Sequence, residues 1–169
     1  MSAMAPGRPS HLTPGWIGAS DGFVLVFPAV AANVSFARAV VAAFAARLPF
    51  TLDEIEELKL AVSEIVANAV LHAYGEDGGP VWLGARVVDG GLEVVVEDAG
   101  RGIQDVAEAR RPGVTRLEGE HLGIGFSVAE SYVGELTVES SPGAGTCVRM
   151  VKRPLQSSAS RAPHPGQPG

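Results

Sequence analysis

The sequence predicts an α/β protein of the α+β kind: a two-layer sandwich in which helices cover one face of a mixed, mainly antiparallel sheet. Apolar residues recur at helical spacing in the first half of the chain, between about residues 33 and 74. Beyond residue 80 the period changes to the alternation that is typical of strands. Strands and helices do not alternate strictly along the chain, and this order favours helices gathered on one face of the sheet.

The amino-terminal half is predicted to contain one strand and two helices. Residues 23–27 are apolar and are expected to form a strand that ends at Pro28. A helix is predicted over residues 33–48 from its helical apolar period. Thr51 and Glu54 form the Thr-x-x-Glu pattern of a capping box, which predicts the start of a second helix that ends near the following Tyr-Gly pair.

The second half is predicted to contain two hairpins, with a long loop and a short helix between them. Strands are expected over residues 81–88, 92–97, 135–139 and 146–152. The segment 98–122 is polar and rich in Gly and Arg, and a loop of that length in a compact domain is usually functional. The short helix is predicted over residues 123–133.

Both ends of the chain are rich in Pro, Gly and Ser and show no period. Such composition buries too little apolar surface to offset the entropy of ordering the chain. We therefore expect disordered tails over residues 1–20 and 154–169, and one folded domain over residues 21–153.

Composition limits the possible environments and partners. The chain has 169 residues, 46% hydrophobic and 19% charged, which suits one domain with a sizeable core. Its formal net charge of -6 disfavours nucleic acid as a direct partner. Cys147 is the only cysteine, so an internal disulfide is impossible. The longest apolar stretches are far short of the roughly 20 residues of a membrane span. We expect a soluble, cytoplasmic protein.

Glu64 and Asn68 lie one turn apart on the second predicted helix, so both side chains project from the same face. Their neighbours are apolar, and polar side chains in such surroundings are costly unless they bind something. Asn68 offers a neutral oxygen of the kind that Mg²⁺ prefers, and Glu64 could remove a proton from an attacking hydroxyl. The alternative is a helix at the rim of the core, with Asn68 hydrogen-bonded to a neighbouring loop.

Asp98, Gly100 and Gly102 directly follow an apolar predicted strand. A carboxylate at a strand end can accept a hydrogen bond from an exocyclic amine such as that of adenine. The two glycines permit a tight turn and a close approach of the backbone to a ligand. The alternative is a plain surface turn.

Two further segments contain glycines at positions that suit a nucleotide. Gly123 and Gly125 precede or open the predicted short helix, where backbone N–H groups form a natural site for phosphate. Thr146 follows Gly145 at the start of the last strand. The first segment is neither a Walker A loop nor a Rossmann fingerprint. The alternatives are a glycine-rich hinge and an ordinary strand residue.

In their order and spacing these segments together resemble the ATP site of the GHKL superfamily, which includes histidine kinases and gyrase B. The chain resembles one branch more closely over about residues 23–152, namely the anti-sigma-F factor serine kinases of spore-forming bacteria. The general stress anti-sigma kinases are similar but match less well. The matching motifs are Asn33-x-Ser35-Phe36-Ala37-Arg38, Val62-Ser63-Glu64 with Asn68-Ala69, His72-x-Tyr74, Glu108-Ala109-Arg110, Gly123-x-Gly125-Phe126 and Ser140-Ser141-Pro142.

The resemblance implies a Bergerat-type ATP-binding fold and an ATP- and Mg²⁺-dependent protein serine/threonine kinase. Such a kinase sequesters a sporulation sigma factor of the sigma-F type as a homodimer, and it phosphorylates an anti-anti-sigma antagonist on serine. By position, Glu64 matches the catalytic base, Asn68 the Mg²⁺ ligand, Asp98 the adenine-binding carboxylate and Arg38 an arginine that contacts partner proteins. The residues implied to surround the ATP or ADP are Gly100, Gly102, Gly123, Gly125 and Thr146.

The chain departs from the family in the lid over the ATP site. The family has a basic residue just before the Gly-x-Gly, where this chain has His121, which is mostly neutral at pH 7. The lid is also about one residue shorter, and Arg116 is a candidate to replace the missing charge. Three alternatives stay open: a nucleotide-dependent sigma-binding module without catalysis, a general stress-response switch kinase with another sigma partner, and a structural domain with a degenerate ATP site. Retention of Glu64 favours a kinase.

Overall fold

A computed structural model describes residues 11–18, 20–111 and 122–155 of the chain. Its centre is a five-stranded sheet with the order β1-β2-β3-β5-β4, in which all neighbouring strands are antiparallel. The strands are β1 (Gly22–Pro28), β2 (Pro80–Val88), β3 (Gly91–Asp98), β4 (Glu135–Ser140) and β5 (Thr146–Lys152). The predicted two-layer sandwich is confirmed, and the sheet described here is wholly antiparallel rather than mixed.

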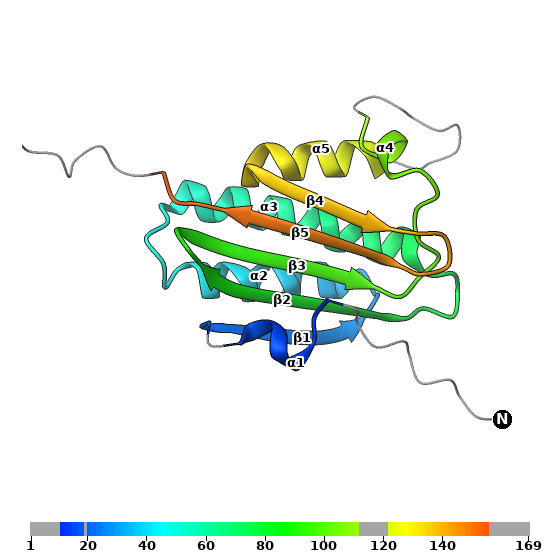
Figure 1. Ribbon diagram of the computed structural model, residues 1–169, viewed down its shortest axis with the longest axis horizontal. Helices are drawn as coiled ribbons and strands as arrows, with labels where there is room; N and C mark the ends of the chain where they lie inside the picture. Colours follow the sequence, from blue (N-terminus) through cyan, green and yellow to red (C-terminus); the bar gives the residue numbers. More distant parts are fainter. Residues whose placement is uncertain (1–10, 19, 112–121, 156–169) are drawn as a thin grey trace, which may run out of the picture.

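Three helices cover one face of the sheet, as the ribbon in Figure 1 shows. They are α2 (Ala32–Ala45), α3 (Leu52–Asn68) and α5 (Leu122–Val133). The shorter helical segments are α1 (Pro14–Ile17), the π-helical turn η1 (Ala69–Ala73) directly after α3, and α4 (Val106–Ala109) inside the predicted long loop. No helix among the described residues is both long and apolar enough to cross a membrane.

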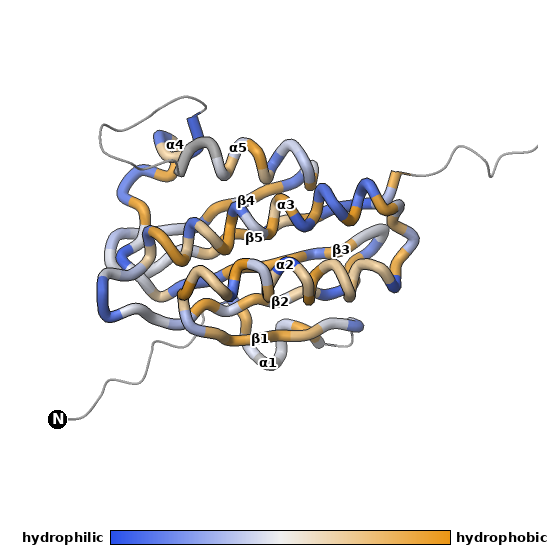
Figure 2. The backbone as a smooth tube through the Cα atoms, turned by 180° about the vertical axis from the view of Figure 1, so that it is seen from behind, coloured by the Kyte–Doolittle hydropathy of each residue, from blue (hydrophilic) through white to orange (hydrophobic). Residues whose placement is uncertain are grey.

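The start of α3 confirms the predicted capping box. The backbone N–H of Glu54 donates to Thr51 Oγ1 (3.2 Å), and the backbone N–H of Thr51 donates to Glu54 Oε2 (2.7 Å). These two bonds satisfy donors that have no partner inside the helix. Figure 2, which views the molecule from the helix side, shows α3 beginning with hydrophilic residues and becoming hydrophobic farther along.

The core lies between the helices and the sheet and follows the alternation of the strands. On β3, Leu92, Val94 and Val96 face the helices and are almost fully buried. From the helices, Leu58 and Ile65 of α3 meet them in the same cluster. Because side chains alternate along a strand, the residues between these face the other side of the sheet.

The opposite, outer face of the sheet is partly covered by residues 11–17, which contradicts the prediction of a tail over that segment. Leu12 is 3% exposed and packs with Trp82 and Val95, and Trp16 joins the same cluster. Gly84 makes room for this packing, because a Cβ there would lie 2.5 Å from Leu12 Cδ2. Figure 1 shows α1 in front of the sheet, on the side away from the other helices.

Polar contacts also fasten this segment. The backbone N–H groups of His11 and Leu12 donate to the buried carboxylate of Glu97 (3.2 and 3.3 Å). Farther along, the buried Glu93 pairs with Arg86 and Arg149, and Arg86 also donates to the carbonyl oxygen of Trp16. Buried carboxylates are costly unless they are paired, so these contacts explain why Glu93 and Glu97 are tolerated on β3.

Residues 152–155 contact the first half of α3. The backbone N–H of Leu155 donates to Glu54 Oε1 (2.6 Å), and Lys152 Nζ lies 2.7 Å from Glu57 Oε2. Residues 154 and 155, which the prediction assigns to the carboxy-terminal tail, lie within the described residues. The rest of that predicted tail, and residues 1–10 of the other, lie outside the described residues.

Candidate nucleotide site

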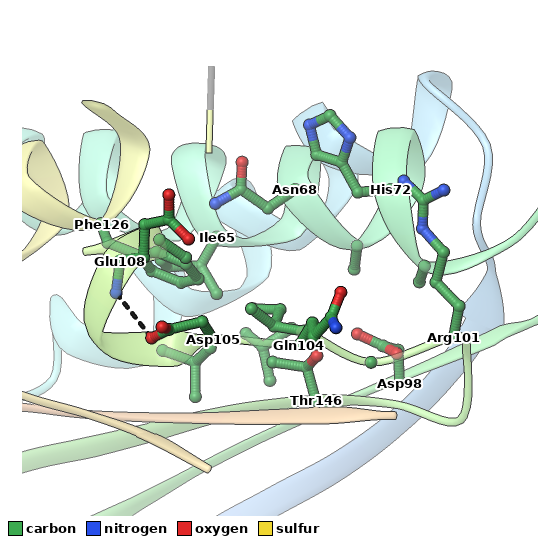
Figure 3. A pocket seen from close by; sticks show the side chains of 17 residues that line it. Ile65, Asn68, His72, Asp98, Arg101, Gln104, Asp105, Glu108, Phe126 and Thr146 are labelled. Carbon is green, nitrogen blue, oxygen red and sulfur yellow. Dashed lines mark hydrogen bonds between the residues drawn. The ribbon is translucent and has the colours of Figure 1, made fainter. Parts of the chain in front are cut away.

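A cavity of about 290 Å³ opens between the helical layer and one end of the sheet. Its upper wall in Figure 3 is formed by α3 and η1, and its floor by the ends of β3 and β5. The loop after β3 and the short helix α4 close one side. Four residues that the sequence predicted for a nucleotide site line it: Asn68, Asp98, Gly102 and Thr146.

Asp98 is the buried carboxylate of this cavity, with 7% of its surface exposed. Burial raises the pKa of Asp98 above its usual value, although hydrogen bonds from the backbone N–H groups of Gly100 and Thr146 act in the opposite direction. The Gly100 bond is 2.9 Å long and uses Oδ1. A carboxylate held in this way can accept a hydrogen bond from a ligand amine that enters the apolar part of the cavity.

The loop after Asp98 is fastened to the end of η1 and to the hairpin between β4 and β5. The backbone N–H of Arg101 donates to Ala73 O (2.8 Å), and that of Ile103 donates to Ser140 Oγ (2.8 Å). A Cβ at Gly100 would lie 2.0 Å from Ala73 O, so this approach requires glycine. Gly102 adopts a φ of 70°, a conformation that glycine adopts without strain. Both glycines are therefore required by contacts within the protein itself.

Glu64 and Asn68 come together with Gly125 where α3 packs against α5. A Cβ at Gly125 would lie 3.1 Å from Asn68 Nδ2 and 3.3 Å from Glu64 Oε2. Asn68 lines the cavity, whereas Glu64 is half-buried one turn earlier and is not among the lining residues. The structure thus joins three predicted site residues from two helices at one edge of the cavity.

The Asn68 side chain fits a ligand-binding role. Its Nδ2 is buried and has no hydrogen-bond partner among the described residues, which is a costly arrangement for a structural asparagine. The described residues contain no group of three or more His, Cys, Asp or Glu side chains that could hold a metal by themselves. Mg²⁺ is usually held by one or two protein oxygens together with phosphate oxygens and water, and a single asparagine suits that pattern.

The remaining predicted site residues lie as follows. Thr146 Oγ1 is 2.9 Å from Ser140 Oγ at the floor of the cavity. Gly123 falls in the first turn of α5. Arg38 is exposed on α2 and does not line the cavity. His121 and Arg116, which bear on the predicted lid, lie outside the described residues.

Several lining residues were not assigned to the site from the sequence. They are His72, Arg101, Gln104, Asp105, Glu108 and Phe126, all labelled in Figure 3. Asp105 caps α4 by accepting a hydrogen bond from the backbone N–H of Glu108 (2.9 Å), a local pattern that the sequence does contain. His72 follows Asn68 by one turn, and the same spacing that linked Glu64 to Asn68 could have identified it.

Most of the chain is similar to known proteins. The family of histidine kinase-like ATPase domains matches residues 27–152. The anti-sigma F factor of Caldanaerobacter subterraneus subsp. tengcongensis is 48% identical over 129 residues, which span 76% of this chain and 90% of that protein. The anti-sigma F factor of Bacillus subtilis is 40% identical over 137 residues, spanning 80% of this chain and 94% of that protein.

The fold has a solved counterpart in the crystal structure of the RsbU and RsbW domains of Rv1364c from Mycobacterium tuberculosis. The TM-score is 0.58 with 24% sequence identity, over 78% of this chain and 32% of that chain. At this identity the likeness concerns the fold alone. It is consistent with an antiparallel sheet covered on one face by helices.

Proposed function

The chain belongs to the family of histidine kinase-like ATPase domains, and we propose that it is an anti-sigma factor that also acts as a protein serine kinase. It binds a sporulation sigma factor of the sigma-F type and uses ATP to phosphorylate a serine of an anti-anti-sigma antagonist. The similarity to anti-sigma F factors over most of both chains supports the sigma-binding part.

The observation that carries the kinase part is the meeting of Glu64 and Asn68 beside Gly125, at the edge of a cavity that contains Asp98. Asp98 accepts a hydrogen bond from the adenine amine deep in the cavity. The wall formed by α3, which carries Asn68, would then receive the phosphates. This arrangement leaves the carboxylate of Glu64 near the far end of the nucleotide.

The reaction is a direct transfer of the terminal phosphoryl group of ATP. Glu64 accepts the proton of the serine hydroxyl while the serine oxygen bonds to the γ-phosphorus, and the bond from that phosphorus to the bridging oxygen breaks to release ADP. Asn68 would hold the Mg²⁺ through its side-chain oxygen. The bound ion would neutralise charge on the phosphates.

The partner contacts lie away from the cavity. Arg38 is exposed on α2, and no ion pair occupies it within the described part of the chain, so its guanidinium is available for a carboxylate of a partner. The proposal includes a homodimer as the sigma-binding form, and binding to a sigma factor would place the protein in the cytoplasm.

The test combines binding and transfer with the full-length protein. Isothermal titration with Mg-ATP, co-purification with a sigma-F type factor in ATP or ADP, and single-turnover phosphorylation of the antagonist are measured for wild type and Asn68→Ala. The proposal expects all three activities in the wild type, and loss of Mg-ATP affinity together with the other two in the variant.

Each alternative gives a different pattern in the same experiment. Nucleotide-dependent sigma binding without any phosphorylation would identify a non-catalytic binding module. Capture of a stress-response sigma factor in place of the sporulation factor would identify a switch kinase of that class. Absence of heat on titration with Mg-ATP would overturn the proposal altogether.

A further inference from the structure

Tyr74, the first residue after η1, uses its hydroxyl to connect two backbone segments. The hydroxyl donates to Pro80 O at the start of β2 (2.6 Å) and accepts from the backbone N–H of Ala99 just after β3 (2.8 Å). A tyrosine hydroxyl has one proton to donate, and here both its donor and an acceptor lone pair are in use.

The bond to Ala99 acts on the loop that carries the adenine carboxylate. Ala99 follows Asp98 directly, and the next residue, Gly100, donates its N–H to Asp98 Oδ1 (2.9 Å). One residue farther, the N–H of Arg101 donates to the carbonyl of Ala73 (2.8 Å). Ala73, the last residue of η1, and Tyr74, which follows it, therefore hold the backbone just after Asp98.

The ring of Tyr74 packs directly against the backbone of Gly79. A Cβ at Gly79 would lie 2.2–2.5 Å from three atoms of the ring, so the ring occupies the space that a side chain would need. Burial raises the pKa of the Tyr74 hydroxyl, which keeps the proton that is donated to Pro80. The hydroxyl is thus fixed in position and in protonation state.

We propose that Tyr74 is a positioning residue for adenine recognition: its hydroxyl fixes the backbone at Ala99 and so aims the Asp98 carboxylate at the exocyclic amine of the base. The proposal rests on the nucleotide-binding function proposed above. It differs from a merely structural role, because loosening Ala99 weakens the contact to one group of the ligand and leaves the contacts to its phosphates unchanged.

The first test compares Tyr74→Phe with Tyr132→Phe, which makes the same chemical change at the chain's other tyrosine, on α5. The dissociation constants of ATP and of purine riboside triphosphate, which lacks the exocyclic amine, are measured for each. We expect ATP affinity to fall about three- to tenfold in Tyr74→Phe, the effect of one neutral hydrogen bond. Affinity for the amine-free analogue should be unchanged, and Tyr132→Phe should resemble the wild type for both ligands.

A second pair of variants keeps the tyrosine itself, and one of the two displaces its ring and with it the hydroxyl. Gly79→Ala puts a methyl group into the Tyr74 ring, whereas Gly75→Ala, four residues earlier in the same loop, meets nothing within 4 Å. The proposal expects the preference for ATP over the amine-free analogue to shrink in Gly79→Ala and to persist in Gly75→Ala.

The outcomes separate this inference from the proposed function. A wild-type protein that binds neither nucleotide would refute the proposed function, and this inference with it. A wild-type protein that prefers ATP, with an equal preference in Tyr74→Phe, would refute the role of Tyr74 alone. An equal loss of both ligands in Tyr74→Phe would likewise overturn it, because that pattern indicates general destabilisation.

Discussion

Glu64 and Asn68, one turn apart on α3, approach the same glycine of α5. The Cβ that Gly125 lacks would lie within 3.3 Å of Glu64 Oε2 and 3.1 Å of Asn68 Nδ2. Both side chains thus face one backbone position, so the proposed proton acceptor and the proposed Mg²⁺ ligand lie at the same edge of the cavity. Although the two side chains are neighbours, their proposed roles differ, so a substitution of each should affect a different activity.

Glu64→Gln should abolish phosphorylation and spare binding. The amide keeps the shape of the side chain but no longer accepts a proton, and loss of a general base typically costs about two to four decades in rate. The single-turnover rate of antagonist phosphorylation is measured beside the affinities for Mg-ATP and the sigma factor. The control is Glu56→Gln, an exposed glutamate of the same helix. Transfer at the wild-type rate by Glu64→Gln would remove Glu64 from the mechanism.

Asp98→Asn should weaken ATP binding while leaving the fold intact. An amide presents a donor as well as an acceptor, and loss of one charge-assisted hydrogen bond costs about 1.5–3 kcal/mol, or roughly ten- to a hundredfold in affinity. Asp89→Asn, in the exposed turn at the other end of β3, provides the matched control. Because burial raises the pKa of Asp98, wild-type affinity should also decline on acidification at a higher pH than for an ordinary aspartate. Equal ATP affinity in Asp98→Asn and wild type would contradict the assignment.

Arg38→Ala should weaken sigma-factor and antagonist binding and leave ATP affinity unchanged. The guanidinium of Arg38 is exposed and has no ion-pair partner among the described residues, so it can form a forked pair with a partner's carboxylate, and such charge-assisted bonds are among the stronger polar contacts. Arg47→Ala is the control, because Arg47 already pairs with Asp21 (2.5 Å) within the chain. Pull-down of the sigma factor measures both variants. If Arg38→Ala retained as much sigma factor as Arg47→Ala, the partner-binding role would be wrong.

Glu54→Gln should lower stability at neutral pH and lose this effect in acid. Burial acts to raise the pKa of Glu54, but hydrogen bonds from Thr51 and Leu155 and the charge of Lys152 outweigh it, so the pKa lies below its usual value. A carboxyl group with a lowered folded-state pKa stabilises the fold above its unfolded-state pKa, and the contribution disappears as the pH falls through the folded-state value. We expect a loss of about 1–2 kcal/mol at pH 7.

Denaturant unfolding at several pH values measures this difference. Glu56→Gln is again the control, since its exposed pair with Lys59 contributes less than about 1 kcal/mol. The unfolding free energies of Glu54→Gln and wild type should converge only after the pH has fallen through the lowered folded-state pKa of Glu54, where its side chain becomes neutral. A constant gap across the whole pH range would show that the contribution of Glu54 does not depend on its charge.

Local signals in the sequence predicted the elements well. The Thr51–Glu54 capping box located the start of α3, and residues 146–152 form the last strand as expected. Both depend on neighbours within a few positions. The order of the strands depends on contacts between distant segments, so β5 lying between β3 and β4 could not be read from the local pattern.

The site was predicted only in part, because local signals identify some of its residues and not others. Asn68 and Asp98 stood out by residue type and spacing, Thr146 was implied only by the resemblance to the GHKL ATP site, and all three line the cavity. Phe126 was not assigned to the site, because the sequence does not distinguish an aromatic residue that faces the core from one that faces a ligand. The packing of Leu12 was missed because the tail was predicted from the composition of the whole segment. Composition does not show that one apolar side chain packs over Gly84.

Residues 11–17 have a consequence for the choice of any shorter form of this protein. The family match begins at residue 27, yet the carbonyl of Trp16 binds Arg86, and Leu12 shields Trp82 and Val95 on the outer face. A chain cut back to the matched segment would present these apolar side chains to water and leave Arg86 without one of its partners. Such a fragment would be prone to aggregation. A shorter form of the protein should therefore keep residues 11–17 in addition to the segment that the family matches.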